Sequence, residues 1–323
     1  MNDSRNTLSA VNNMWHKLGR IATSACAPFH LIWEFTESDF PTFVVPNTAF
    51  GILAALAATP LVNTSGSSVS WLSVLQNFPA VLIFNWWHTF IFDLSHQWSP
   101  QSVAEDRINK PWRPIPKGKI TPDQTRRLIL VIIPLSLGLD YYMNVWDQGI
   151  VIHVITWMYN DLGGCDEWFF IRDLCTASAF AMFNSGALKI ASGCYMNDDQ
   201  CDVNELGHIW TGIISAVIFT TMQVQDLKDQ EGDRLRNRKT VVLLFGESVS
   251  RASIALLVLF WSLVCVCFWG TSLRTFALAI LPAIVVIWKV MMSGYNKTED
   301  RRTWQLWSVW LICLYALPLV GNN

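Results

Sequence analysis

Charged residues are scarce in this sequence. Asp, Glu, Lys and Arg make up only 15% of its 323 residues, whereas soluble domains carry about 25%. Hydrophobic residues make up 52%, so the composition excludes an ordinary soluble domain and indicates a membrane protein. The net charge is only −2, and the sequence therefore also lacks the basic excess that marks a nucleic-acid-binding protein.

Cysteine and histidine motifs are missing as well. The eight Cys form no CxxC pair and no zinc-like spacing, and the histidines show no metal-ligand spacing, so we expect most of them to be structural. Cys194 and Cys201 flank a short acidic loop. They would form a disulfide if that loop is lumenal, and the sequence leaves this pairing open. No compact apolar run with a small-residue cleavage site follows the charged start, so we expect no cleavable signal peptide.

Long apolar stretches, in contrast, are abundant. Nine segments approach the ~20 residues that cross a bilayer as a helix. We therefore predict an all-α, polytopic membrane protein, with an N-terminal cytosolic or interfacial segment at residues 1–37 and a transmembrane domain at residues 38–323. The apolar segments lie at residues 40–60, 71–97, 124–143, 146–160, 167–191, 205–226, 247–268, 272–292 and 302–320.

The basic residues predict the orientation. With nine crossings, all Lys and Arg except Lys189 and Arg274 fall on the side that receives the N-terminus. The positive-inside rule makes that side cytosolic, and we expect the membrane to be the endoplasmic reticulum. The glycosylation sequon at Asn63 then lies in the lumen, whereas the sequon at Asn296 lies in the cytosol and stays unmodified.

A first group of polar residues follows the segment at 71–97. Asp93 lies inside that segment, where an ionisable side chain indicates function. In the cytosolic loop after it, Asp106 is an acid that can hold Mg2+, while Lys110 and Arg113 can bind phosphate oxygens. Topology alone also explains some of the basic residues of this loop.

A second acidic group follows the segment at 205–226. Asp226, Asp229 and Asp233 are spaced three and four apart, so on a helix they share one face. Three such carboxylates repel one another unless a cation lies between them, and Mg2+ prefers a few carboxylates together with substrate phosphates. A solvated acidic turn is the alternative. Because both groups fall on one membrane face, we predict a Mg2+ site for a diphosphate that carries a hydrocarbon tail.

Together these motifs resemble the UbiA superfamily of intramembrane prenyltransferases, which has nine transmembrane helices and aspartate-rich motifs after helices two and six. The resemblance spans about residues 40–320. It rests on Asp106-x-x-Asn109-Lys110-Pro111-x-Arg113-Pro114-Ile115-Pro116-x-Gly118, on Asp226-x-x-Asp229-x-x-Gly232-Asp233 and on Arg238-Lys239-Thr240.

The first aspartate-rich motif departs from the family pattern Asn-Asp-x-x-Asp-x-x-x-Asp. The corresponding region reads Asp93-Leu94-Ser95-His96-Gln97, with a longer stretch before Glu105-Asp106, so at least one expected carboxylate is missing or displaced. This departure is similar to the fungal branch of UbiA-type terpene cyclases. So are Trp33-x-Phe35-Thr36-x-Ser38-Asp39 and Tyr159-Asn160-Asp161-Leu162-Gly163-Gly164.

The resemblance implies a class I terpene cyclase, a carbon–oxygen lyase of secondary metabolism acting on farnesyl or geranylgeranyl diphosphate. Its carbocation needs a dry pocket with aromatic faces. Two alternatives remain open: a prenyltransferase that uses an aromatic or lipid acceptor, and a non-enzymatic transporter. The expected catalytic residues and metal ligands are Asp93, Asp106, Asp226, Asp229 and Asp233. The expected diphosphate-binding residues are Asn109, Lys110, Arg113, Arg172 and Lys189, and the expected pocket aromatics are Trp87, Phe90, Tyr159 and Phe183.

Overall fold

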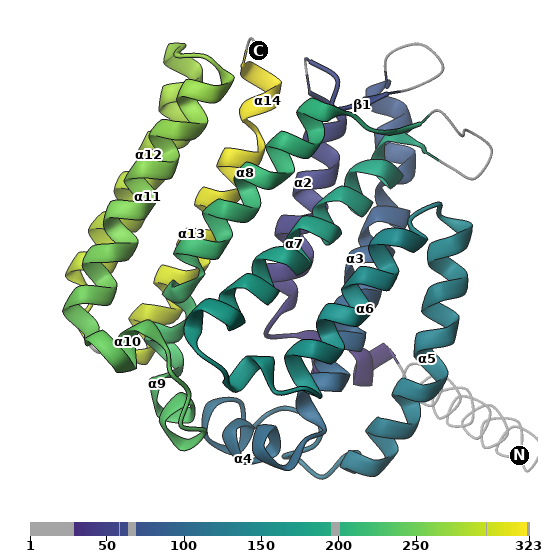
Figure 1. Ribbon diagram of the computed structural model, residues 1–323, viewed down its shortest axis with the longest axis vertical. Coiled ribbons are helices and arrows are strands. Elements are labelled where there is room, and N and C mark those ends of the chain that lie inside the picture. The colour runs from purple at the N-terminus through teal and green to yellow at the C-terminus, as the bar shows by residue number, and fades with distance from the viewer. Residues whose placement is uncertain (1–28, 58, 64–68, 195–200, 295, 322–323) are drawn as a thin grey trace, which may run out of the picture.

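The computed structural model describes residues 29–57, 59–63, 69–194, 201–294 and 296–321. They form a bundle of long helices that run side by side, with short helices at one end and a small two-stranded sheet at the other (Figure 1). The predicted all-α fold class is confirmed. Most of the predicted segment 1–37 lies outside the described residues.

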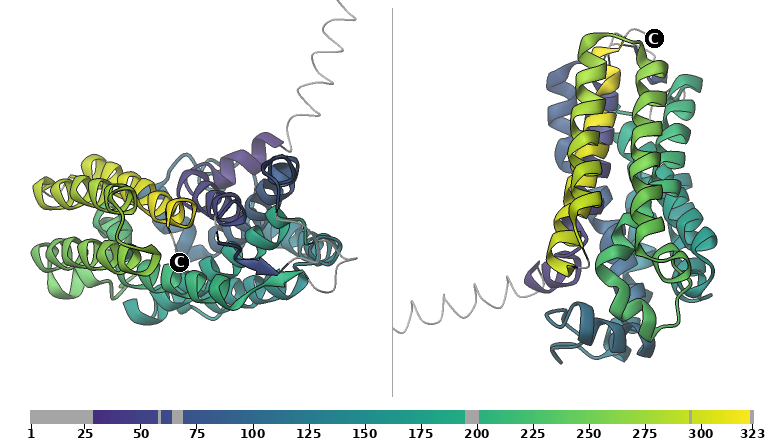
Figure 2. Two further views of the ribbon diagram at one scale, coloured as in Figure 1. Left: turned by 90° about the horizontal axis from the view of Figure 1, so that it is seen from above. Right: turned by 90° about the vertical axis from the view of Figure 1, so that its left-hand side faces the viewer.

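The long helices make up the wall of the bundle. They are α2 (Val45–Ala55), α3 (Trp71–Gln97), α5 (Pro122–Tyr142), α6 (Trp146–Asn160), α7 (Phe169–Ser192), α8 (Glu205–Thr221), α11 (Glu247–Trp269), α12 (Leu273–Met292) and α13 (Lys297–Tyr315). The short elements are η1 (Phe40–Val44), α4 (Pro100–Asn109), η2 (Gly164–Asp166), η3 (Met222–Gln225), α9 (Asp226–Leu235), α10 (Val241–Phe245), α14 (Leu317–Val320), β1 (Val62–Asn63) and β2 (Asp202–Val203). Seen end-on, α11, α12 and α13 lie on one side of the bundle and α3, α5 and α6 on the other, with α2 and α7 between them (Figure 2).

Each of the nine predicted apolar segments corresponds to a helix. Four helical stretches have the length and composition needed to cross a membrane: Glu205–Leu235, Glu247–Trp269, Leu273–Met292 and Lys297–Val320. The other segments are shorter or carry charged residues; α6, for example, has only 15 residues. The count of nine crossings therefore stays a prediction.

One part of the sequence expected to be a loop is helical. The cytosolic loop after residue 97 begins with α4. Ser99 is its N-cap, and its hydroxyl accepts a hydrogen bond from the Ser102 backbone N–H at 3.2 Å, while Pro100 occupies the first turn, where its missing N–H costs nothing. A serine followed by proline is a helix start signal that the polarity of this stretch obscured.

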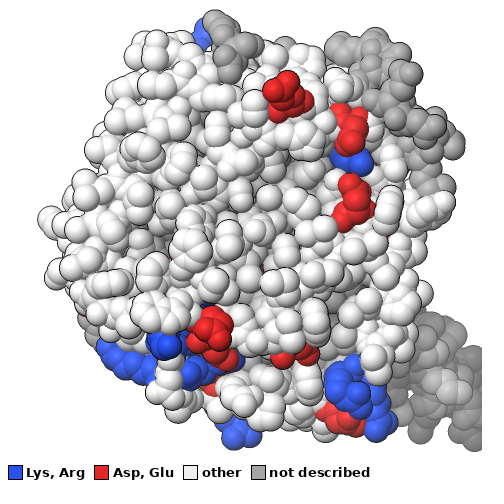
Figure 3. Space-filling model, viewed as in Figure 1, with Lys and Arg blue, Asp and Glu red and all other residues white. Residues whose placement is uncertain are grey.

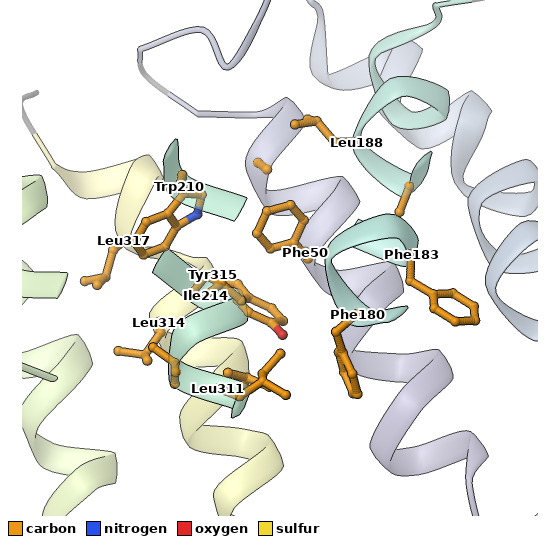
Figure 4. Packing of buried hydrophobic residues seen from close by; sticks show 14 of the residues in the cluster. Phe50, Phe180, Phe183, Leu188, Trp210, Ile214, Leu311, Leu314, Tyr315 and Leu317 are labelled. Carbon is orange, nitrogen blue, oxygen red and sulfur yellow. The ribbon is translucent and has the colours of Figure 1, made fainter. Parts of the chain in front are cut away.

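The main apolar core lies where α2, α7, α8 and α13 meet (Figure 4). Phe50 of α2 packs edge-on against Tyr315 of α13, with ring centroids 5.1 Å apart. In lipid, tight helix packing depends on small residues rather than on hydrophobic burial. Gly51 provides this contact, because a Cβ there would lie 2.7 Å from the Ala187 backbone. The core therefore fixes α7, which carries part of the site described below.

The end of the bundle opposite α4 and α9 holds β1 and β2. Val62 pairs with Val203 and Asn63 with Asp202 in antiparallel register. A disulfide joins Cys194 to Cys201 next to this sheet, which confirms the pairing that the sequence had left open. On the visible face, most Lys and Arg gather at the α4 and α9 end (Figure 3). This distribution agrees with the predicted orientation, which stays a prediction.

Candidate active site

A pocket opens between η1, α3, α4, α6, α7 and α9, at the end of the bundle rich in basic residues. Both acidic groups predicted from the sequence line it, so segments more than 100 residues apart meet in one cavity. Its charged lining residues are Asp39, Asp93, Glu105, Asp106, Lys110, Arg113, Arg172, Asp226, Asp229, Asp233 and Arg238.

Arg113 organises the first acidic group. Its Nη1 donates to both carboxylate oxygens of Asp106, at 2.9 and 3.0 Å. Its Nη2 donates to Asp39 Oδ2 at 2.9 Å and lies 3.6 Å from Asp93 Oδ1. Arg113 is only 2% exposed. A buried guanidinium that faces three carboxylates holds them together, and its fork geometry suits phosphate oxygens equally well.

Asp39 supplies a carboxylate that the first motif lacks. It is the residue before η1 and reaches the pocket beside Asp93, with Lys110 Nζ 3.6 Å from its Oδ1. The predicted site residues did not include Asp39, because it lies 54 positions before Asp93. The available signal was an acid placed directly at the start of an apolar segment, as in the two motifs that were recognised.

The second acidic group lies on α9, as its spacing predicted. The 3-10 turn η3 joins α8 to α9 and brings Asp226 to the pocket. Arg172 of α7 forms an ion pair with Asp226, and Lys228 forms one with Asp229. The α7 arginine thus serves this group as Arg113 serves the first.

A direct bridge joins the two groups. Arg238 Nη1 donates to Asp233 Oδ1 at 2.8 Å and to Glu105 Oε1 at 3.1 Å. Arg236 Nη1 donates to the other oxygen of Glu105 at 3.1 Å. The backbone supports this bridge, because α9 ends at a residue with positive φ, Asn237 (φ 55°), which turns the chain back toward α4.

Electrostatics at the pocket mouth depends on burial and on these arginines. Burial alone would raise the pKa of Glu105, but Arg238, His96 and Arg236 outweigh it and lower that pKa to about 2. Burial also opposes ionisation of Asp39, yet Lys110 and Arg113 lower its pKa well below the ordinary value. At Asp106 burial prevails over Arg113 and Lys110, and the pKa is raised.

The carboxylates fit a divalent cation. One oxygen each of Asp93, Asp226 and Asp233 is buried without a hydrogen-bond partner among the described residues. A buried, unpaired carboxylate oxygen is costly. Oxygen ligands from a few carboxylates are what Mg2+ takes in sites that it shares with phosphates.

Below its charged mouth the pocket is aromatic. Phe43 and Phe180 pack with ring centroids 5.0 Å apart, and Phe92 and Tyr159 with centroids 5.5 Å apart. Phe183 completes this lining. Figure 4 shows Phe180 and Phe183 on neighbouring turns of α7. Such a surface offers a hydrocarbon chain an apolar wall and offers a cation the negative faces of the rings.

Most of the predicted site residues line this pocket, but three lie elsewhere. Trp87 and Phe90 pack in a separate apolar cluster around Phe35, because they point from α3 away from α7. Lys189 lies at the far end of α7, where its Nζ is 3.4 Å from Asp202 Oδ1. We therefore remove these three residues from the site. The prediction also omitted Glu105, Arg238, Phe43, Phe92 and Phe180, which do line the pocket.

The whole chain is similar to proteins of known activity. Fumagillin beta-trans-bergamotene synthase of Aspergillus fumigatus is 25% identical over 302 residues, which cover 94% of this chain and 95% of that protein. The diterpene cyclase eriG of Hericium erinaceus is 28% identical over 293 residues, which cover 88% of this chain and 85% of that protein.

The fold is also that of a solved structure. A UbiA homolog from Archaeoglobus fulgidus, bound in that structure to GPP and Mg2+, matches with a TM-score of 0.61 at 13% identity, over 90% of this chain and 99% of that chain. A family model described as the UbiA prenyltransferase family matches residues 44–312. By this match over most of its length, and by the two acidic groups that meet in one pocket, the chain belongs to the UbiA prenyltransferase family.

Proposed function

We propose that the chain is a Mg2+-dependent terpene cyclase that ionises a linear prenyl diphosphate and closes the resulting carbocation into a ring. The observation that carries this proposal is the pocket itself. Two acidic groups and three arginines surround its mouth, and five aromatic side chains line the space beneath. A charged diphosphate and an apolar isoprenoid tail match these two zones.

The charged zone would bind the headgroup. Asp93, Asp106, Asp226, Asp229 and Asp233 would hold Mg2+, with Asp39 as a further carboxylate. Bound Mg2+ supplies positive charge that weakens the allylic C–O bond of the substrate.

Several cations would bind the diphosphate oxygens directly. Arg113 and Arg172 form ion pairs with carboxylates of both acidic groups, and Lys110 lies beside them. Their charges stabilise the negative charge that develops on the leaving diphosphate. Asn109 hydrogen-bonds Lys297, with Oδ1 3.2 Å from Nζ, and holds the end of α4 against this zone.

The aromatic zone would control the carbocation. Phe180, Phe183 and Tyr159 exclude water, which would otherwise capture the cation. Their faces also stabilise positive charge as it moves along the chain. The reaction balances without a co-reactant, because the diphosphate leaves with the bonding electron pair and a proton is lost to form the final double bond.

A prenyltransferase that passes the same cation to an aromatic or lipid acceptor is the second candidate, and the family name favours it. The cyclase is preferred because both cyclases named above match along nearly their whole length. A non-enzymatic transporter fits less well, since the charged lining of the pocket lies at one end of the bundle.

The decisive experiment omits the acceptor. Purified protein receives Mg2+ and either farnesyl or geranylgeranyl diphosphate, and gas chromatography with mass spectrometry identifies the products. A cyclic hydrocarbon from one substrate, absent when EDTA replaces Mg2+, supports the proposal. Turnover that appears only after an aromatic or lipid acceptor is added overturns it in favour of the transferase.

A further inference from the structure

A second polar cluster lies outside the candidate active site. It consists of His88 of α3, Ser136 and Asp140 of α5, and His153 of α6, which meet on the side of the bundle away from α9. His88 and Asp140 are each only 1% exposed. Ionisable side chains buried in a membrane bundle are costly and indicate a function. The proposed reaction uses none of these four residues.

The four side chains are spaced as the ligands of one ion. His88 Nε2 lies 3.1 Å from Asp140 Oδ2 and 3.4 Å from Ser136 Oγ. Ser136 Oγ lies 3.2 Å from His153 Nε2 and 3.5 Å from Asp140 Oδ2. A tetrahedral ion with bonds of about 2.0–2.1 Å separates its ligand atoms by about 3.3–3.4 Å. The observed separations bracket that value.

The hydrogen bonding of His88 requires a cation. Its Nδ1 lies 2.9 Å from the Phe84 carbonyl oxygen, which can only accept, so we assign the ring hydrogen to Nδ1. In the neutral ring the lone pair of Nε2 then faces the carboxylate of Asp140. Two acceptors in that position repel each other unless a cation lies between them. A histidine whose second nitrogen donates to a backbone carbonyl is the usual arrangement of a metal ligand.

Asp140 shows the same requirement from its other side. Its Oδ1 is buried and has no hydrogen-bond partner among the described residues. The fold nevertheless makes room for this carboxylate, because a Cβ at Gly149 of α6 would lie 2.2 Å from Asp140 Oδ2. His153 Nδ1 is likewise buried without a partner in the described part of the chain. The cluster thus has unused ligand atoms at its centre.

We propose that His88, Asp140 and His153 bind one Zn2+ ion, with Ser136 Oγ at the fourth position. Two imidazoles with one carboxylate suit Zn2+, whereas Mg2+ prefers oxygen ligands alone. Phe183 packs edge-on against His88, with centroids 6.0 Å apart, and this same side chain lines the active-site pocket. The ion therefore lies behind the pocket wall and ties α3, α5 and α6 together without contacting the prenyl substrate.

Metal analysis tests this site without measuring turnover. The full chain is purified without a polyhistidine tag, incubated with zinc sulfate, desalted and analysed by inductively coupled plasma mass spectrometry. We expect about one zinc ion per chain. His153→Gln should lower zinc affinity by about tenfold or more. His208→Gln, the same change at an exposed histidine of α8, should retain the wild-type content.

Thermal melting gives a second readout. Zinc added to chelator-treated wild type and His208→Gln should raise Tm, because a ligand that binds only the folded state stabilises it. His153→Gln should show no such shift. A wild-type chain that retains no zinc, and whose Tm does not respond to zinc, would overturn the proposal and leave a cluster held together by a shared proton. That outcome depends on no variant, and it leaves the Mg2+-dependent cyclase activity to be judged separately.

Discussion

At the scale of single residues, Asp39 decides how complete the first acidic group is. Its carboxylate shares Arg113 with Asp106 and Asp93, although it precedes the first long helix. Sequence reasoning identified an incomplete motif but had no means to find the replacement. A carboxylate that arrives from another segment becomes visible only when the helices are packed.

Asp39→Asn should lower kcat/KM for prenyl diphosphate by about tenfold or more and raise the Mg2+ concentration needed for half-maximal rate. The physical reason is the loss of one negative charge from the group that would hold the cation. Glu37→Gln, the matched change at an exposed acid two positions earlier, should leave both quantities unchanged. Equal Mg2+ dependence of the two variants would exclude Asp39 from the site.

Asp229→Ala should abolish turnover, by about a hundredfold or more, with no loss of folded protein. Asp229 is the least buried acid of α9 that lines the pocket and its removal relieves repulsion within that helix, so the fold has little reason to weaken. Product formation and the detergent-solubilised yield measure the two effects. Asp123→Asn, at an exposed acid in the first turn of α5, is the control. Wild-type rates in Asp229→Ala would make the α9 acids structural.

At the scale of elements, the approach of α4 to α9 positions the two acidic groups. Gly232 of α9 permits it, because a Cβ there would lie 2.1 Å from Asn109 Nδ2 and 2.9 Å from Glu105 Cγ. Neither α4 side chain can retreat freely, since Glu105 is bound by Arg236 and Arg238 and Asn109 by Lys297.

Gly232→Ala should therefore separate the two helices, destabilise the protein by about 1–3 kcal/mol and reduce turnover more than tenfold. Gly212→Ala is the matched control, because a Cβ at this helical glycine of α8 meets open space. There alanine should be neutral or stabilise the helix by up to about 1 kcal/mol. Thermal melting and product formation compare the two variants. If Gly232→Ala melts and turns over like the control, the close approach does not control the site.

The same elements show what the sequence could predict. Uninterrupted apolar runs made the nine long helices visible, and α3 and α6 begin and end where the runs do. The carboxylates of α9 were found because three- and four-residue spacing is a property of the helix itself. The rotation of each long helix was not predictable, because α3 is apolar on all its faces. Trp87 and Phe90 were therefore placed in the pocket, although Phe92 is the aromatic residue of α3 that lines it.

At the scale of the whole molecule, the fold has two chemically different ends. One end carries α4, α9 and most of the visible Lys and Arg (Figure 3), and the active-site pocket opens there. The other end carries the β1–β2 pair and the disulfide between Cys194 and Cys201. Disulfides persist in the oxidising lumen rather than in the cytosol. Charge and sulfur chemistry therefore predict the same orientation, with the pocket facing the cytosol.

The two sequons turn this orientation into a measurement. Asn63 is exposed at the disulfide end, so it should carry a glycan when the chain is made in a eukaryotic cell. Asn296 should stay bare, because it lies at the start of α13, near the α9 end. Its side chain there also caps the helix, with Oδ1 accepting from the Thr298 backbone N–H at 3.0 Å.

Endoglycosidase H should then shift the wild-type chain by one glycan on a gel. Asn63→Gln should remove the shift, whereas Thr298→Ala, which destroys only the second sequon, should leave it. The reverse pattern would place the α9 end in the lumen. The carboxylates and arginines of the pocket would then face a compartment opposite to the one that the basic residues predict, so the result for these two asparagines decides on which side of the membrane the prenyl diphosphate must be supplied.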